Sequence, residues 1–148
     1  MVAIRRAEPT DLPVLLALLS QLSDRNSAPE DTVASHTFAA MLAQPGLSVF
    51  LAEMAGRVVG TITLVLVPNL TRGARPFGII ENVVTDQAMR GRGVGKALIA
   101  HGIAECQMRN AYKVMLMTGR TDAAALGFYR ACGFVSGAKT AFEIRFDA

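Results

Sequence analysis

The sequence predicts an α+β fold, an α/β sandwich in which a mixed, mostly antiparallel central sheet is flanked by about four helices. Its length of 148 residues fits one compact domain, so we expect a single domain over residues 1–148. Hydrophobic residues make up 51% of the chain and charged residues 18%, a balance that excludes a disordered protein. Apolar runs joined by a short turn predict antiparallel hairpins, and a later strand–helix–strand run requires a parallel neighbour.

Each element is predicted by a local pattern. Leucines at helical spacing follow Thr10 and Asp11, which are suited to cap a helix, and Gln44-Pro45-Gly46 ends a second helix. Apolar runs bounded by turn formers predict strands. Helices are expected at residues 12–22, 29–43, 94–109 and 122–132, with loops over 24–31 and 68–76. Strands are expected at residues 2–7, 47–54, 58–67, 77–85, 113–118, 134–136 and 139–146.

Charge and cysteine usage exclude several kinds of site. The net charge is +3, and residues 86–148 hold nine basic and five acidic groups, so the positive excess lies in the second half. Cys106 and Cys132 are far apart and lack neighbouring histidine pairs, which predicts no disulfide framework and no metal. Apolar runs are far shorter than the ~20 residues of a membrane span, and charges occupy the place of a signal peptide's apolar stretch. We expect a cytoplasmic protein that binds no membrane.

A basic, glycine-rich turn carries the most information. Residues 90–97 read Arg-Gly-Arg-Gly-Val-Gly-Lys-Ala, after an expected strand and at the start of an expected helix. A helix N-terminus has unpaired N–H groups and a partial positive charge, and glycines allow a ligand to approach the backbone. With Arg90, Arg92 and Lys96 nearby, this turn predicts a phosphate or pyrophosphate site. The alternative is a basic turn whose glycines serve tight packing.

The common nucleotide-binding motifs do not match this turn. A P-loop needs Gly where Arg90 stands and Ser or Thr where Ala97 stands. A dinucleotide fingerprint that starts at Gly91 needs Gly at Lys96, and one that starts at Gly93 needs it at Leu98. The sequence therefore predicts an anion site of another kind.

The pattern that does fit is [Gln/Arg]-x-x-Gly-x-[Gly/Ala], present as Arg90, Gly93 and Gly95. Downstream, residues 128–134 read Phe-Tyr-Arg-Ala-Cys-Gly-Phe, similar to a Phe-Tyr-x-x-x-Gly-Phe helix ending. With these two motifs about 35 residues apart, the chain resembles the GNAT superfamily of acyl-CoA-dependent N-acetyltransferases. The expected element order is similar to that family's acyl-CoA N-acyltransferase fold along essentially the whole chain. The resemblance implies acetyl-CoA as the co-substrate.

The resemblance also implies which residues meet the cofactor. The pyrophosphate of coenzyme A would rest on main-chain N–H groups of residues 92–97, with Arg90 shaping the turn, and the pantetheine arm would pair with the strand end at residues 83–85. Asp122 stands where many relatives have an Asn that touches the cofactor, and a helix N-cap is the alternative for it. The residues expected at the cofactor are Val83, Val84, Thr85, Arg90, Arg92, Gly93, Val94, Gly95, Lys96, Ala97 and Asp122.

Two residues are expected to handle protons. Tyr129 matches the family's usual general acid, and a phenol with a reference pKa of ~10 stays protonated and can donate to a departing thiolate. Glu81 lies in an apolar run on the strand leading to the cofactor, where burial would raise its pKa and suit it as the general base, direct or through water. A structural carboxylate is the alternative for Glu81. Residues 81–84 resemble the Glu-Asp-Val/Ile stretch of glucosamine-phosphate N-acetyltransferases, with Asn82 in place of the Asp.

The predicted function is transfer of an acetyl group from acetyl-CoA to a primary amine of a small molecule by direct attack. The alternatives are an acyl-CoA-binding sensor without turnover and an acetyltransferase that acts on a protein or peptide amine. The acceptor is expected near residues 22–38, net acidic over 24–31, and near residues 67–77, where Arg72 and Arg75 suit a carboxylate or phosphate. Few aromatics and no recognised motif argue against a nucleic-acid partner. The resemblance implies a homodimer.

Overall fold

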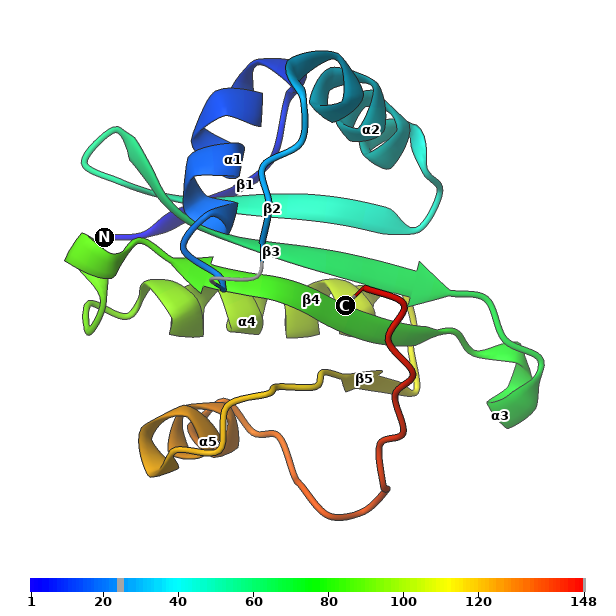
Figure 1. Ribbon diagram of the computed structural model, residues 1–148. Helices are drawn as coiled ribbons and strands as arrows, with labels where there is room; N and C mark the ends of the chain where they lie inside the picture. Colours follow the sequence, from blue (N-terminus) through cyan, green and yellow to red (C-terminus); the bar gives the residue numbers. More distant parts are fainter. Residues whose placement is uncertain (24–25, 148) are drawn as a thin grey trace.

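The computed structural model describes residues 1–23 and 26–147, and in it a five-stranded sheet carries helices on both faces (Figure 1). The strands are β1 (Ala3–Arg6), β2 (Leu47–Met54), β3 (Arg57–Val67), β4 (Phe77–Thr85) and β5 (Lys113–Met115). The α-helices are α1 (Leu12–Leu19), α2 (Asp31–Ala43), α3 (Thr71–Ala74), α4 (Val94–Met108) and α5 (Ala123–Ala131). Short 3-10 helices, η1 (Pro9–Asp11) and η2 (Gln87–Met89), precede α1 and α4.

The sheet has the order β1-β2-β3-β4-β5, so neighbours in space are neighbours in sequence. The first four strands pair antiparallel. Between β2 and β3 the chain turns through Ala55 and Gly56, both at positive φ (51° and 74°), a hairpin geometry that matches the twist of the strands. β5 runs parallel to β4 because α4 crosses over the sheet between them. The predicted mixed, mostly antiparallel sheet is confirmed.

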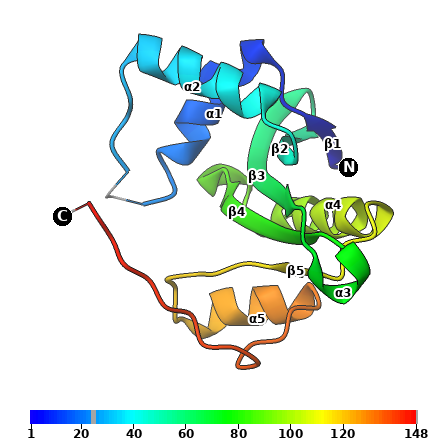
Figure 2. The same ribbon diagram turned by 90° about the vertical axis from the view of Figure 1, so that its right-hand side faces the viewer.

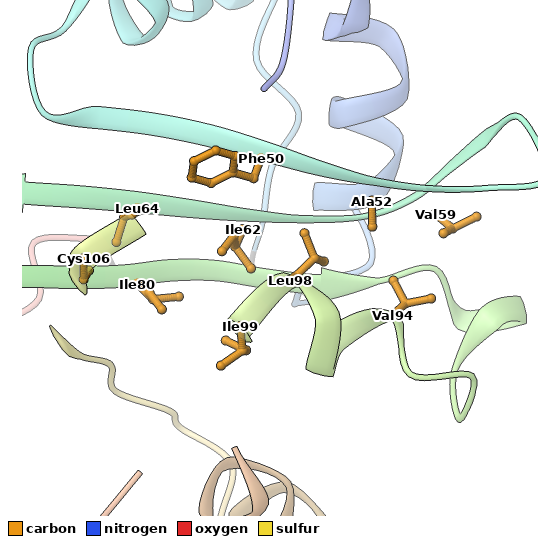
Figure 3. Packing of buried hydrophobic residues seen from close by; sticks show 10 residues of the cluster. All are labelled: Phe50, Ala52, Val59, Ile62, Leu64, Ile80, Val94, Leu98, Ile99 and Cys106. Atoms are coloured by element: carbon orange, nitrogen blue, oxygen red, sulfur yellow. The ribbon is translucent and has the colours of Figure 1, made fainter. Parts of the chain in front are cut away.

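Both faces of the sheet are covered, and the alternation of side chains along β2 shows how. Phe50 and Ala52 point to the face under α4, while Val49 and Leu51 point to the face under α1 and α2. Figure 2 shows these helices on opposite sides of the sheet. Figure 3 shows the larger cluster, which joins three strands to α4: Phe50, Ala52, Val59, Ile62, Leu64, Ile80, Val94, Leu98, Ile99 and Cys106.

The expected strands at residues 134–136 and 139–146 are wrong, and the strand expected over 113–118 ends at Met115. The segment after α5 does show the two-residue alternation of a strand, but a strand needs a partner for its main-chain groups, and this segment has no partner strand among the described residues. Figure 2 shows it as an extended arm that runs past α5 and away from the sheet. As a result Phe142, Ile144 and Phe146 are 91%, 82% and 97% exposed.

Other differences concern element ends. The helix expected over 12–22 stops at Leu19, where the Ser20 hydroxyl donates to the carbonyl of Ala17 and the following residues continue as tighter turns. The carboxylate of Asp11 does not cap this helix, because it is bound by Arg5 and by the N–H of Glu8 instead. α3 occupies four residues of the expected 68–76 loop, and the 24–31 loop lies partly outside the described residues. In the part of the chain that is described, no helix is both long and apolar enough to span a membrane.

Candidate active site

A cavity of about 980 Å³ opens where β4 and β5 separate. The two strands pair only from Phe77 to Ile79 on β4 and from Lys113 to Met115 on β5. Beyond Ile79 the β5-facing edge of β4 has no partner strand among the described residues, and the cavity fills that side. The cavity is lined by Gln21, Leu22, Ser23, Ile80, Glu81, Asn82, Val83, Val84, Thr85, Arg90, Gly91, Gly93, Val94, Gly95, Lys96, Leu116, Met117, Thr118, Gly119, Arg120, Ala124, Ala125, Phe128 and Tyr129.

A β-bulge shapes the β4 wall of the cavity. The register between β3 and β4 shifts between Thr61 and Thr63, and Asn82 on β4 has a positive φ of 53°. Such a φ is uncommon outside glycine, although asparagine tolerates it better than most residues. The bulge leaves Glu81 exposed in the cavity, so the expectation that Glu81 is buried is wrong. The apolar neighbours of Glu81 in sequence, such as the buried Ile80, pack on α4 and do not cover it.

The glycine-rich turn forms another part of the cavity wall. Gly91 and Gly93 have φ of 76° and 81°, and a Cβ added at either position would meet nothing within 4 Å. Gly93 is the N-cap of α4, and its carbonyl accepts the first helical bond from the N–H of Ala97 at 3.0 Å. The N–H groups of residues 94–96 therefore have no acceptor within the helix. Open space beside unpaired donors is the arrangement that an anionic ligand needs.

Gly95 has a different role from the other two glycines. A Cβ atom there would lie 3.1 Å from the Phe128 ring and 3.4 Å from the hydroxyl of Thr85. Gly95 thus allows α4 to pack closely against α5 and β4. The exposed side chains of Arg90 and Lys96 line the cavity, whereas Arg92 and Ala97 are not part of its lining.

Tyr129 stands on α5 and lines the cavity. Its half-buried ring packs edge-to-face on Phe128 and Phe134, with ring centroids 5.1 Å and 6.4 Å away. Burial raises the pKa of Tyr129, while the nearby Arg120 cation lowers this pKa and Cys132 raises it further. The phenol is therefore protonated at neutral pH and can donate a hydrogen bond into the cavity.

The model of the Acetyltransferase (GNAT) family matches residues 15–134 of the chain. The chain belongs to the GNAT family. It is 36% identical over 133 residues to the glucosamine 6-phosphate N-acetyltransferase of Trypanosoma brucei brucei, covering 88% of this chain and 87% of that relative. A putative acetyltransferase from Agrobacterium tumefaciens str. C58 superimposes with a TM-score of 0.92 at 51% identity, covering 97% of this chain and 99% of that one. The acetyltransferase Tb11.01.2886 of Trypanosoma brucei superimposes with a TM-score of 0.80 at 32% identity, over 100% of both chains.

These findings confirm the predicted family, its acyltransferase fold and an N-acetyltransferase as the class of enzyme. GNAT acetyltransferases take the acetyl group from acetyl-CoA, and the residues of this GNAT protein fit that co-substrate. The observation that decides the fit is the empty space at Gly91 and Gly93 next to the unpaired N–H groups of α4, flanked by Arg90 and Lys96.

Three charged residues expected at the site of this GNAT protein have other partners. The Asp122 carboxylate accepts from the N–H of Ala125 at 3.2 Å, as the N-cap of α5, and from Arg120, and it is not among the cavity-lining residues. Arg75 donates from Nε and Nη2 to the carbonyls of Asn110 and Ala111. The Arg72 guanidinium lies 5.7 Å from the centre of the Tyr112 ring.

Reasoning from the sequence missed several residues of the cavity, among them Gln21 and Arg120. Gln21 lines it shortly after α1, next to Leu22 and Ser23 of the expected acceptor region, and the Gln21 side-chain oxygen accepts from the N–H of Gln87 at 2.9 Å. This bond joins segments 66 residues apart, which no local pattern indicates. Arg120 was also missed, although its position two residues before the α5 N-cap was a usable signal. Residues 24–25, which belong to the expected acceptor region, lie outside the described residues.

Proposed function

We propose that this GNAT protein transfers an acetyl group from acetyl-CoA to a primary amine of a small molecule, as one catalytic domain over residues 1–148. The observation that carries the proposal is that one cavity is lined by the glycine-rich turn, the open edge of β4, Glu81 and Tyr129. An anion site, a main-chain edge, a carboxylate and a phenol are the groups that transfer from a thioester to an amine requires.

For the co-substrate, the N–H groups of residues 92–96 would bind the pyrophosphate, with charge from Arg90, Arg92 and Lys96. The N–H of Ala97, which was also expected there, is already bonded to the carbonyl of Gly93. The free edge at Val83, Val84 and Thr85 would pair with the amide groups of the pantetheine arm, as a strand pairs with a sheet edge. Asp122 would act on the co-substrate indirectly, by fixing the start of α5.

Bound acetyl-CoA would supply the thioester from which the acetyl group leaves. Tyr129 is the general acid in this proposal, because its phenol is protonated and lines the same cavity as the strand edge. Glu81 is the general base that takes a proton from the ammonium of the acceptor, directly or through water, so that the free amine can attack the thioester carbonyl. Its exposure in the cavity makes it reachable. With both substrates held side by side, the transfer needs no covalent enzyme intermediate.

For the acceptor, we propose an amino sugar phosphate and take glucosamine 6-phosphate as the first compound to test. The support is the Trypanosoma brucei brucei relative of that name, which the chain matches over most of both lengths. Asn82 replaces the Asp of the related stretch and stands on the bulge beside Glu81. This difference makes the uncharged amide of Asn82 a determinant of which amine fits.

The experiment is a thiol-release assay with acetyl-CoA and a panel of amines: glucosamine 6-phosphate, glucosamine, an aminoglycoside, free amino acids and a peptide with one lysine. Acetyl-CoA-dependent release with the sugar phosphate, with a product mass increased by one acetyl group, is expected. Turnover with the peptide alone would reject the small-molecule acceptor. Acetyl-CoA binding by calorimetry without turnover on any amine would favour a sensor over an enzyme.

We also propose a homodimer, supported by the exposed arm after α5. Phe142, Ile144 and Phe146 are almost fully exposed at two-residue spacing, and such a stripe is expected to be covered in a stable protein. Light scattering on a sizing column measures the mass in solution. A monomer of 15.7 kDa at every concentration would reject this part of the proposal.

A further inference from the structure

The segment that follows α1 forms part of the cavity wall without belonging to a strand or a helix. Gln21, Leu22 and Ser23 line the cavity, and their side chains are exposed. Local bonds fold this segment onto the end of α1, because the N–H of Gln21 donates to the carbonyl of Leu18 and that of Leu22 to the carbonyl of Leu19, both at 3.0 Å. Bonds of this kind do not fix where the segment lies relative to the sheet.

A bond from Gln21 to a distant segment supplies that position. The side-chain oxygen of Gln21 accepts from the main-chain N–H of Gln87 at 2.9 Å, across 66 residues of sequence. Gln87 opens the 3-10 helix η2, and the first N–H groups of a helix have no acceptor within it. Gln21 therefore caps η2 from another part of the chain. Because the donor is a main-chain N–H, the bond does not depend on the Gln87 side chain.

η2 is itself held in place by several contacts. The N–H of Asp86, just before η2, donates to the carbonyl of Val59 on β3 at 2.8 Å, and the Asp86 carboxylate accepts from the N–H of Ala88 at 3.1 Å. Met89 packs against the larger core cluster. The Gln21 bond thus ties the segment after α1 to the sheet, at the connection between β4 and the glycine-rich turn.

We propose that Gln21 is a positioning residue for the amine acceptor, whose bond to the Gln87 N–H holds Leu22 at the cavity as an apolar wall for the carbon skeleton of the amine. The inference rests on the proposed function, in which the amine reacts beside Glu81 in this cavity. Leu22 follows Gln21 directly and is 42% exposed, so its side chain presents apolar surface to the cavity. Burial of that surface against the acceptor favours an amine with apolar carbon surface of its own.

The expected effect of this bond is on position and not on stability. The bond is exposed to solvent, so water can replace either partner when the other is removed. α1 would stay docked without it, because Leu15 and Leu18 are buried. The local turn would also persist, since Asn26 Nδ2 donates to the carbonyl of Leu19 at 2.7 Å. Loss of the Gln21 bond would therefore release the segment from the sheet without unfolding it.

The bond can be removed from either end. Gln21→Met removes the acceptor oxygen and keeps the length of the side chain. Gln87→Pro removes the donor, and proline suits the first position of a helix, while Asp86 before it has the ψ of 128° that a residue before proline prefers. Gln87→Ala is the matched control, because it leaves the N–H in place and changes a side chain outside the cavity lining. Gln21→Glu is the conservative variant, since its carboxylate can still accept.

The first measurement needs no substrate. The chain has no tryptophan, so Leu22→Trp places a single indole on the segment itself, and time-resolved fluorescence anisotropy measures how freely that indole moves. In this background Gln21→Met and Gln87→Pro should each enlarge the fast component of the decay, and the combined variant should enlarge it no further. Gln87→Ala and Gln21→Glu should keep the decay of the parent. Circular dichroism checks that each variant is folded.

The second measurement is turnover with Leu22 in place. Gln21→Met should raise KM for the amine about 2- to 10-fold, the effect of one net hydrogen bond. The kcat at saturating amine and the Kd of acetyl-CoA should change little, because Glu81, Tyr129 and the glycine-rich turn are untouched. A residue with a purely structural role would lower Tm and leave KM for the amine unchanged.

An unchanged anisotropy decay in both Gln21→Met and Gln87→Pro would overturn the inference, because the bond would then not hold the segment. A changed decay with an unchanged KM for the amine would overturn it as well, since the segment would then not contact the acceptor. An equal rise of KM in Gln87→Ala would show that the bond is not the cause. If no amine is turned over, the proposed function fails, whereas the anisotropy decides separately whether Gln21 holds the segment.

Discussion

Gly78 on β4 lies directly against Cys106 on α4, and a Cβ atom added at Gly78 would be 2.6 Å from the Cys106 sulfur. Cys106 is buried, and the added carbon would also lie 3.3 Å from a methyl group of Val114. The contact occurs where β4 pairs with β5, just before the two strands separate at the cavity. Close packing at this point therefore supports the geometry of the site.

Gly78→Ala is predicted to destabilise the protein by about 1–3 kcal/mol, the usual effect of an extra carbon in a tight core. Adding Cys106→Ala should partly offset this destabilisation, because the second substitution removes the sulfur atom that the new methyl group would meet. Urea unfolding of the two single variants and the double variant measures the coupling, expected at about 0.5–3 kcal/mol. Additive effects of the two substitutions would show that the contact is not the cause.

Tyr129→Phe is predicted to lower kcat by about 100-fold or more, the contribution of a positioned proton donor. The ring and its packing on Phe128 remain, so acetyl-CoA should bind with an unchanged Kd. Steady-state kinetics over a range of pH, together with calorimetry, check both parts. An unchanged kcat at every pH would exclude Tyr129 as the acid.

Glu81→Gln is predicted to lower kcat/KM for the amine by about 10- to 100-fold at neutral pH. The amide cannot accept the proton that the ammonium must lose. At a pH above the pKa of the amine, the acceptor is already neutral, and the difference from the parent should narrow. A deficit of equal size at all pH values would indicate that Glu81 positions the acceptor rather than taking its proton.

Gly93→Ala is predicted to destabilise the protein by about 1–2 kcal/mol, because Gly93 has a φ of 81° that an alanine adopts poorly. A turn that relaxes toward negative φ would misdirect the N–H groups of α4, so acetyl-CoA should bind about tenfold more weakly. Gly127→Ala is the matched control, since Gly127 lies inside α5 with open space around it and ordinary helical φ. It should stabilise the protein by about 0.5–1 kcal/mol and leave binding unchanged.

Asp11→Asn is predicted to destabilise the protein by about 1–3 kcal/mol at pH 7. Asp11 is buried, and its carboxylate accepts from Arg5 Nη1 and Nη2 at 2.8 Å and 2.9 Å and from the N–H of Glu8 at 2.7 Å. The hydrogen bonds from Arg5 hold the pKa of Asp11 below its ordinary value.

The sign of the pH effect follows from that shift. A carboxylate whose pKa is lowered by folding contributes stability above the unfolded-state pKa of about 3.9, and this stability is lost as the pH falls through the folded-state pKa. The difference in unfolding free energy between parent and Asp11→Asn should therefore be constant from pH 5 to pH 7 and shrink below about pH 4. Chemical unfolding at each pH measures it, and a difference that grows in acid would contradict the assignment.

Local patterns predicted most of the fold because they depend on few neighbours. The alternation along β2 and the turn at Ala55 and Gly56 specify a hairpin without knowledge of the rest of the chain. The same kind of alternation gave a wrong strand prediction at residues 139–146. Phe142 and Ile144 have the spacing of a strand there, but the segment has no partner edge among the described residues. A strand is defined by pairing between distant segments, which a local pattern cannot supply.

For the site, the sequence by itself determined the glycine-rich turn of residues 90–97 and the Tyr129 motif, since each depends on residue type at short spacing. Only the tertiary structure decided how these parts meet. The bulge at Asn82 exposes Glu81, the separation of β4 from β5 opens the cavity, and Glu81 and Tyr129 come to line the same cavity. Burial, electrostatic fields and cavities arise from residues far apart in the chain, so they exist only once the sheet and its helices have packed together.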